Sequence, residues 1–141
     1  MYGSSSLEVA TLAAGAGVML SAAYLLGFGV LAVAGPARAF RYLRRFASTI
    51  ALHVVELFVR FVVGAAFIGY ASQMQFGGIF KTIGITVVIT TLGLALIPWR
   101  WHQRVAQRTV PAVERYVPLM GIASIAAGAF VIWAVASRLP G

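Results

Sequence analysis

The sequence predicts an all-α integral membrane protein, a bundle of four transmembrane helices. Hydrophobic residues make up 61% of the 141-residue chain and charged residues 10%. Soluble domains average roughly 45–50% apolar and about 25% charged residues. The apolar residues lie in four long runs, each near the roughly 20 residues that a helix needs to cross a hydrocarbon core. Because the runs are continuously apolar and do not alternate like barrel strands, only helices would satisfy their backbone polar groups in lipid.

One transmembrane domain, 1–141, should contain all four helices. Their expected bounds are about 7–34, 48–71, 79–97 and 117–136. Gly35 and Pro36 end the first helix, because a flexible residue precedes one that lacks an N–H. Pro98 ends the third, and Pro118 fits the first turn of the fourth, where its missing N–H has no intrahelical partner. The first run is too long for the h-region of a signal peptide, so we expect it to be retained as a helix.

Two arginine-rich connections join the predicted helices in pairs. The first, 37–47, also carries aromatic residues and predicts either a short interfacial segment or the first turns of the next helix. The second, 100–116, is expected to be broken by Pro111. Their arginines are Arg38, Arg41, Arg44 and Arg45 in the first connection and Arg100, Arg104, Arg108 and Arg115 in the second. We expect these side chains to contact membrane lipids, including anionic lipids, or a partner subunit.

The distribution of positive charge predicts the orientation. The two connections hold eight of the eleven Lys and Arg residues, whereas the opposite side carries only Lys81 and Arg138. The positive-inside rule therefore places both connections in the cytoplasm and both termini outside it. The net charge of +8 would favour nucleic acid for a soluble protein, but these arginines flank membrane spans, so we expect no nucleic-acid partner.

The two halves of the chain look like copies of one unit, composed of a helix, a proline, an arginine-rich connection and a second helix. Pro36 aligns with Pro98, and the small-residue run that starts at Gly64 aligns with the one at Gly128, at an offset of about 62 to 65 residues. If each half begins and ends outside, the halves are parallel repeats related by an axis along the membrane normal. The alternative is that any four helices obeying the positive-inside rule look self-similar.

The second predicted helix carries three ionisable residues, His53, Glu56 and Arg60, at steps of three and four that place them on one helical face. Glu56 and Arg60 should lie near the membrane midplane, where ionisable groups are costly and pair with each other inside the bundle. A functional interpretation makes Glu56 a proton or cation site, with His53 as its cytoplasmic entry. We favour a structural Glu–Arg pair, or one that recognises a partner, because a glutamate beside an arginine stays ionised and carries protons poorly.

One place in the sequence could hold a cofactor. His53 and His102 both belong near the cytoplasmic face, so a bis-histidine haem, or a chlorophyll, between the second and third helices is geometrically conceivable. The alternative is that both are ordinary interfacial histidines, which the tryptophan and arginine residues around His102 favour. The chain contains no cysteine and only three carboxylate side chains, so we expect no other metal site.

Small residues at four-residue spacing predict close helix packing. They are Ala13, Gly17 and Ser21 in the first helix and Ser124 and Gly128 in the fourth. Such faces let two backbones approach closely within one chain. In a protein this small, some of them should also face lipid or another subunit, so self-association is a reasonable expectation.

The run 97–102, IPWRWH, together with the upstream Glu56 and Arg60, lies in a stretch, 52–136, that resembles small four-helix bacterial inner-membrane proteins of uncharacterised function. The resemblance covers a little over half of the chain, and its motifs are moderately specific. It implies a bacterial origin and a helical topology. It implies no activity, substrate or catalytic residue, because that family brings none.

The sequence contains no Gly-rich phosphate loop, Ser/His/Asp arrangement or carboxylate pair, and its loops are too short to build a pocket, so we expect no enzyme. The function we expect first is that of a non-enzymatic accessory or structural subunit of a larger bacterial inner-membrane complex or of a homo-oligomer. One alternative is a small oligomeric transporter, or an ion or proton pathway, that uses Glu56. A second alternative is a helical subunit that binds haem or a pigment.

Overall fold

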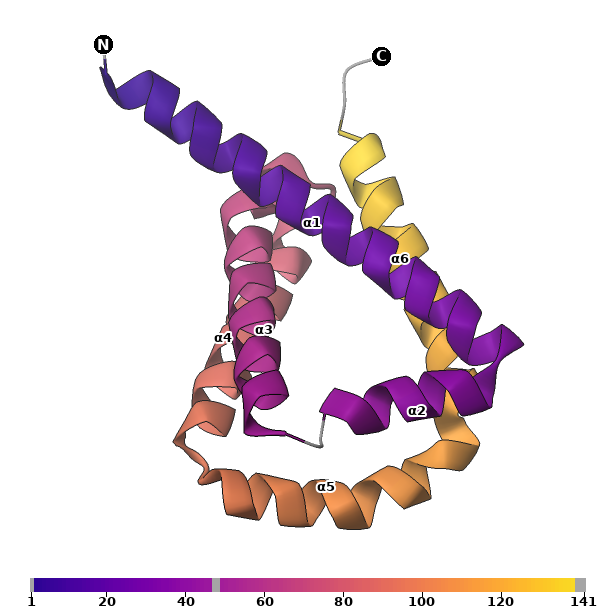
Figure 1. Ribbon diagram of the computed structural model, residues 1–141. Helices are drawn as coiled ribbons and strands as arrows, with labels where there is room; N and C mark the ends of the chain where they lie inside the picture. The colour runs from indigo at the N-terminus through magenta and orange to yellow at the C-terminus, as the bar shows by residue number, and fades with distance from the viewer. Residues whose placement is uncertain (1, 47–48, 139–141) are drawn as a thin grey trace.

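A computed structural model describes residues 2–46 and 49–138, which are helical almost throughout (Figure 1). Four of the helices are long and apolar enough to cross a membrane, and the described residues contain no strand. These spans are α1 (Tyr2–Ala34), α3 (Ile50–Tyr70), α4 (Gly77–Leu96) and α6 (Val117–Ala136). The all-α bundle predicted from the sequence is confirmed, and the fold is that of a multi-pass helical membrane protein.

Two shorter helices and two 3-10 turns connect the spans. The helices are α2 (Pro36–Phe46) and α5 (Trp99–Val113), and the turns are η1 (Ala71–Gln73) and η2 (Glu114–Tyr116). Gly35 alone separates α1 from α2, and Pro98 directly precedes α5. A proline suits the start of a helix because its φ is already helical and its missing N–H would have no partner there. Each arginine-rich connection therefore begins as a separate helix and does not simply extend the next span.

Local signals explain several helix ends. Thr49 caps α3, because its side chain accepts a hydrogen bond at 3.4 Å from the backbone N–H three residues on. Ser48, where we predict this helix to begin, lies outside the described residues. Phe76 has φ 58° and ψ 40°, and this left-handed residue starts α4 at Gly77, two residues before the predicted position. α1 begins at Tyr2, earlier than predicted, because hydropathy marks the apolar run and not the polar turn that extends it.

The second arginine-rich connection differs from the prediction. The expectation that Pro111 breaks it is wrong, because α5 runs through Pro111 to Val113. Pro111 lies in the last turn of α5. Its missing N–H leaves one carbonyl group without a hydrogen bond, but the last four carbonyl groups of any helix have no partner within the helix, so the added cost is small. The chain changes direction in η2 and enters α6 at Val117, the predicted start, with Pro118 in the first turn.

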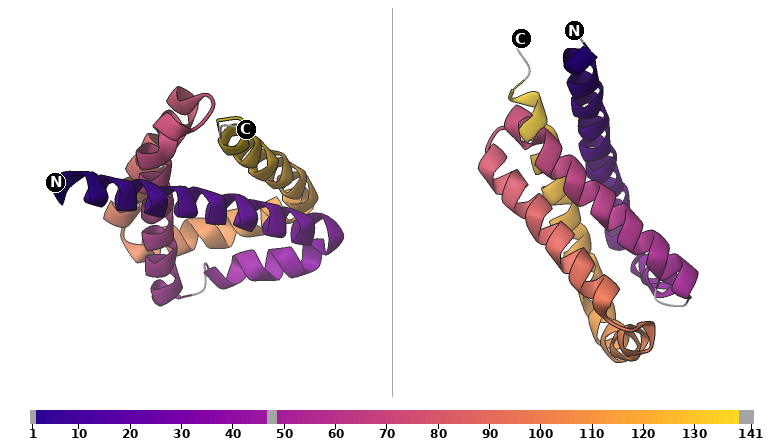
Figure 2. Two further views of the ribbon diagram at one scale, coloured as in Figure 1. Left: turned by 90° about the horizontal axis from the view of Figure 1, so that it is seen from above. Right: turned by 90° about the vertical axis from the view of Figure 1, so that its left-hand side faces the viewer.

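The spans form two pairs that converge at one end of the molecule. α1 packs along α6, α3 packs along α4, and α1 also crosses α3. Figure 1 shows the pairs close together towards the end where α1 begins and α6 ends, and apart at the opposite end, which α2 and α5 bridge. Viewed from above, α1 lies across α3 (Figure 2). The spans therefore diverge towards the arginine-rich end.

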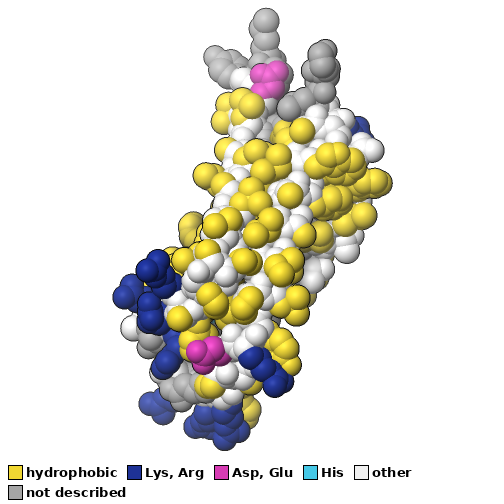
Figure 3. Space-filling model, turned by 90° about the vertical axis from the view of Figure 1, so that its right-hand side faces the viewer, with side chains coloured by type: hydrophobic (Ala, Val, Ile, Leu, Met, Phe, Trp, Pro, Cys, Tyr) yellow, Lys and Arg dark blue, Asp and Glu magenta, His cyan; other side chains and the backbone are white. Residues whose placement is uncertain are grey.

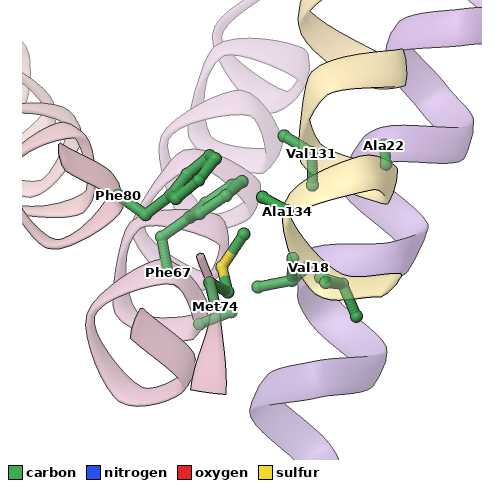
Figure 4. Packing of buried hydrophobic residues seen from close by; sticks show 9 residues of the cluster. Val18, Ala22, Phe67, Met74, Phe80, Val131 and Ala134 are labelled. Carbon is green, nitrogen blue, oxygen red and sulfur yellow. The ribbon is translucent and has the colours of Figure 1, made fainter. Parts of the chain in front are cut away.

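Two clusters of buried side chains hold these helices together. The larger lies towards the converging end and joins all four spans; it includes Val18, Ala22, Phe67, Met74, Phe80, Val131 and Ala134 (Figure 4). Within it the rings of Phe67 and Phe80 stack at 5.9 Å. The smaller cluster joins α1, α2 and α6 at the opposite end and consists of Ala32, Ala39, Phe40 and Val117. The backbone N–H of Gln75 also donates to the carbonyl of Ala134 at 2.8 Å, which ties the turn before α4 to α6.

The contacts within the two helix pairs repeat. A Cβ atom on Gly128 of α6 would lie 3.0 Å from the carbonyl oxygen of Ala22 on α1. A Cβ atom on Gly64 of α3 would likewise lie 3.0 Å from the carbonyl oxygen of Gly84 on α4. Ala22 and Gly84 are 62 residues apart, which is also the spacing of the prolines that follow α1 and α4. The contact of α1 with α6 is therefore the counterpart of the contact of α4 with α3, as two parallel repeats require.

The spans leave most of their surface uncovered. Only 17% to 22% of the residues in the most apolar part of each span are buried inside the chain. Figure 3 shows hydrophobic side chains over the middle of one face and Lys and Arg side chains gathered at one end. A single copy therefore presents broad apolar faces to lipid or to another protein.

Candidate functional site

The candidate site is an ion pair inside the third helix, the span α3. Glu56 and Arg60 lie about 9 and 15 Å along the helix from its first residue, Ile50, at 1.5 Å per residue. The hydrocarbon core is about 30 Å thick, so Arg60 lies close to the middle of the span and Glu56 lies between it and the arginine-rich end. Ionisable side chains at this depth are rare because removing a charge from water is costly.

The two charges pair with each other along one turn of the helix. Arg60 Nη1 donates to Glu56 Oε1 at 3.2 Å. The pair is not enclosed by the bundle, because 41% of the Arg60 side chain and 33% of the Glu56 side chain remain exposed. The guanidinium carries five N–H donors, so this one hydrogen bond leaves donor capacity for another group.

Two tyrosines from neighbouring helices extend this polar region. The hydroxyl groups of Tyr24 on α1 and Tyr42 on α2 are hydrogen-bonded, and the charge of Glu56 acts on the Tyr24 hydroxyl. The Phe28 ring lies beside both, with its centroid 6.3 Å from that of Tyr24 and 6.5 Å from that of Tyr42. The tyrosine pair therefore joins the first two helices, α1 and α2. Sequence reasoning missed both tyrosines, although Tyr24 is a hydrogen-bonding residue inside an apolar run and could have been noted.

His53 lies closer to the arginine-rich end than the ion pair. It is buried, with 5% of the residue exposed, and its ring lies 5.1 Å from the ring of Trp99 at the start of α5. This contact joins the beginning of α3 to the beginning of α5. The structure thus gives His53 a packing role between two helices, whereas Glu56 and Arg60 are half-buried and paired with each other.

The haem hypothesis needs a second histidine. His102 belongs to α5, but its side chain lies outside the described residues. Among the side chains that are described, no group of three or more His, Cys, Asp or Glu residues is placed to hold a metal ion. Haem or chlorophyll binding stays a prediction, and an absorption spectrum of the purified protein tests it directly.

The arginines of the two connections all lie at one end of the molecule and are exposed. They are Arg38, Arg41, Arg44 and Arg45 on α2, Arg100, Arg104 and Arg108 on α5, and Arg115 in η2. Arg44 lies 5.9 Å over the ring of Phe40, and Arg115 lies 4.6 Å over the ring of Tyr116. These aromatic contacts favour a position at the boundary between lipid and water.

The predicted small-residue positions have different environments. Gly17 faces α3, where a Cβ would meet Ala66 at 2.9 Å. Ala13 is exposed, Ser124 is half-buried, and the Ser21 hydroxyl donates to a carbonyl of its own helix at 2.7 Å. Gly128, as described above, packs against α1.

Sequence reasoning missed one close approach between α1 and α6. A Cβ on Gly29 would lie 2.7 Å from the carbonyl oxygen of Gly121, and a Cβ on Gly121 would lie 2.9 Å from the carbonyl oxygen of Gly29. The two backbones can approach this closely because neither residue has a side chain. Gly29 keeps the four-residue spacing of Ala13, Gly17 and Ser21, but Leu25 interrupts the run of small residues before it.

A comparison of the chain with protein families, with characterised proteins and with solved structures found no match. The similarity to small bacterial inner-membrane proteins therefore stays a prediction.

Proposed function

We propose that this chain is a non-enzymatic structural or accessory subunit of a bacterial inner-membrane assembly, either with other proteins or with copies of itself. In this proposal the arginine-rich end faces the cytoplasm and both termini face the opposite side. The observation that carries the proposal is the ion pair of Glu56 and Arg60, which lies at membrane depth and is incompletely covered by its own bundle.

The exposure of the pair favours a partner. An arginine at the centre of a span costs roughly 2.5–3.5 kcal/mol on insertion scales, and pairing with a carboxylate offsets part of that cost. With 41% of its side chain exposed, Arg60 can still donate to a carbonyl or carboxylate of a neighbouring helix. A partner helix at this position would remove the remaining exposure of both charges.

The surface around the pair is also suited to a helix. Directly beside the ion pair on α3, Val55 and Val59 form an apolar strip, and each residue is 51% exposed. A partner there would bury these side chains together with the ion pair. Charges inside such a contact specify the position and orientation of the partner, because a shifted helix would leave them unpaired.

A charge reversal separates partner recognition from simple self-pairing. The double variant Glu56→Arg/Arg60→Glu keeps an intrahelical ion pair but reverses the charges that a partner would meet. After mild extraction from native membranes, we expect the wild type to migrate in a native gel as a larger assembly whose components mass spectrometry identifies. The double variant should lose that assembly while keeping its helical content. A control variant, Glu8→Gln at the other end of the molecule, should assemble like the wild type.

Two results would overturn the proposal. A wild-type protein that runs as a monomer without a partner would remove its basis. Normal assembly of the charge-reversed variant would show that the ion pair only satisfies itself.

An alternative function, an ion or proton pathway, is favoured by one separate observation. Tyr24 on α1 and Tyr42 on the interfacial helix α2 form a hydrogen-bonded pair, and the Tyr24 hydroxyl lies within the electrostatic influence of the Glu56 carboxylate. Glu56→Gln should then abolish cation or proton flux in proteoliposomes while leaving assembly intact. Unchanged flux in this variant, or no flux in the wild type, would exclude the pathway.

A further inference from the structure

The helix α5 has little support from the rest of the protein. Its first residue, Trp99, contacts His53, and its last turn packs against η2. Between these ends, α5 does not pack extensively against any other helix of the described chain. A 15-residue helix is only marginally stable by itself in water, so something else must cover its apolar side.

The uncovered side of α5 is apolar. Trp101 is 65% exposed and Val105 is 61% exposed, and their spacing of four residues places them next to each other on the helix. The equivalent helix of the first half, α2, has no such face, because Ala39 and Phe40 are buried in the smaller hydrophobic cluster. The two connecting helices have similar composition but only one is covered by protein.

Cations follow one edge of the same helix. Arg100, Arg104 and Arg108 are all exposed and repeat every four residues, so they form a line along α5. No acidic residue occurs between Trp99 and Val113. A helix that carries tryptophan and valine beside a line of arginines has the composition of helices that lie in the plane of a membrane surface.

The position of α5 fits the same surface. It connects the arginine-rich ends of two spans, α4 and α6, and runs across the long direction of α3 and α4 (Figure 1). It must therefore lie near the level where the spans leave the hydrocarbon core. We propose that α5 binds the anionic phospholipids of that leaflet, with Trp101 and Val105 among the upper acyl chains and Arg100, Arg104 and Arg108 on the headgroup phosphates.

The chemistry of the headgroups explains why anionic lipids are preferred. A guanidinium donates two parallel hydrogen bonds to a phosphate, and its charge is favoured further where the surface is negative. Each arginine near an anionic surface should strengthen binding about fivefold at moderate salt. Three such residues on one helix should therefore produce a preference for anionic over zwitterionic lipid that is easy to measure.

Tryptophan fluorescence tests this directly, because the chain has three tryptophans. In the variant Trp99→Phe/Trp133→Phe, Trp101 is the remaining reporter. The protein is placed in vesicles of phosphatidylcholine and phosphatidylglycerol in which one or the other lipid carries bromine on the upper acyl chain. We expect brominated phosphatidylglycerol to quench Trp101 several-fold more strongly than brominated phosphatidylcholine at equal mole fraction.

Matched variants separate the role of α5 from a general effect of charge. Arg100→Gln/Arg104→Gln/Arg108→Gln should bring the quenching by the two lipids to equality, and 1 M salt should do the same, because it shortens the Debye length to about 3 Å. The variant Arg41→Gln/Arg44→Gln, on α2, should leave the preference at Trp101 unchanged. In a second reporter, Trp99→Phe/Trp101→Phe, Trp133 on α6 should show no preference.

Three outcomes would overturn the proposal. If neither lipid quenches Trp101, this residue is covered by protein, and α5 is a docking surface for another subunit. Equal quenching by both lipids would show an interfacial helix without anionic preference. If the preference for phosphatidylglycerol survives the arginine substitutions on α5, other residues are its cause.

Discussion

The two halves of this protein share a pattern of helices but differ in what supports the connecting helix. Each half consists of a span, a proline, an amphipathic helix rich in arginine and a second span. In the first half, α2 buries Phe40 against α1 and α6, whereas in the second half α5 leaves Trp101 exposed. α2 connects two spans that cross each other, α1 and α3, so protein lies beside it. α5 connects α4 and α6, which do not pack along their length within the described chain.

The polar cluster also belongs to one half. With Gly64 aligned to Gly128, the positions that correspond to Glu56 and Arg60 are Met120 and Ser124 on α6. The shared features are therefore those that make a span, and the features that differ are the ion pair and the packing of the connecting helix.

The largest expected effect concerns the two connecting helices. Phe40→Ala should destabilise the protein by about 3 kcal/mol, because it leaves a cavity in a packed cluster. Trp101→Ala should change stability in detergent by less than about 0.5 kcal/mol, since 65% of this residue is exposed. Unfolding monitored by circular dichroism in mixed micelles compares the two variants. Equal losses would mean that α5 is packed as firmly as α2.

Glycine substitutions test the equivalence of the two helix pairs. Gly64→Leu and Gly128→Leu should each destabilise the fold by about 1–3 kcal/mol, because the added side chain meets a neighbouring carbonyl. Gly27→Leu and Gly93→Leu serve as controls, since a Cβ at either position meets nothing within 4 Å. Gly64→Leu and Gly128→Leu should lower the free energy of unfolding by similar amounts. A loss in only one of them would argue that the pairs are not related by the repeat.

The smallest effect concerns the tyrosine contact of the first half. Tyr42→Phe removes the hydroxyl bonded to Tyr24 and should cost about 1 kcal/mol, the usual net value of one hydrogen bond. Tyr116→Phe, at an exposed residue of the second half, should be neutral within the error of the same unfolding measurement. Neutrality of both variants would remove the tyrosine pair as a support for the first half.

The sequence predicts the spans well because each span is recognised from its own run of residues, without knowledge of its neighbours. A continuous apolar run of about 20 residues has few alternatives to a transmembrane helix. The clustering of the arginines and the repeated prolines are likewise visible without a structure. Both Glu56 and Arg60 could be identified because a charge inside such a run is conspicuous.

Contacts between helices were harder to predict because they depend on which faces meet. Gly29 and Gly121 approach closely only because α1 lies along α6, and no local pattern specifies that choice. The same holds for Tyr24 and Tyr42, which lie on different helices. The different support of α2 and α5 follows from the arrangement of four spans, so two segments of similar composition could not be told apart in sequence.

Hydrogen exchange tests the central claim, that protein supports α2 and anionic lipid supports α5. The full chain is placed in nanodiscs with and without phosphatidylglycerol, and the exchange of backbone amides is followed by mass spectrometry. We expect α2 to be protected in both, and α5 to be protected with phosphatidylglycerol and to exchange at least tenfold faster without it. Equal protection of both helices in both membranes would contradict the account.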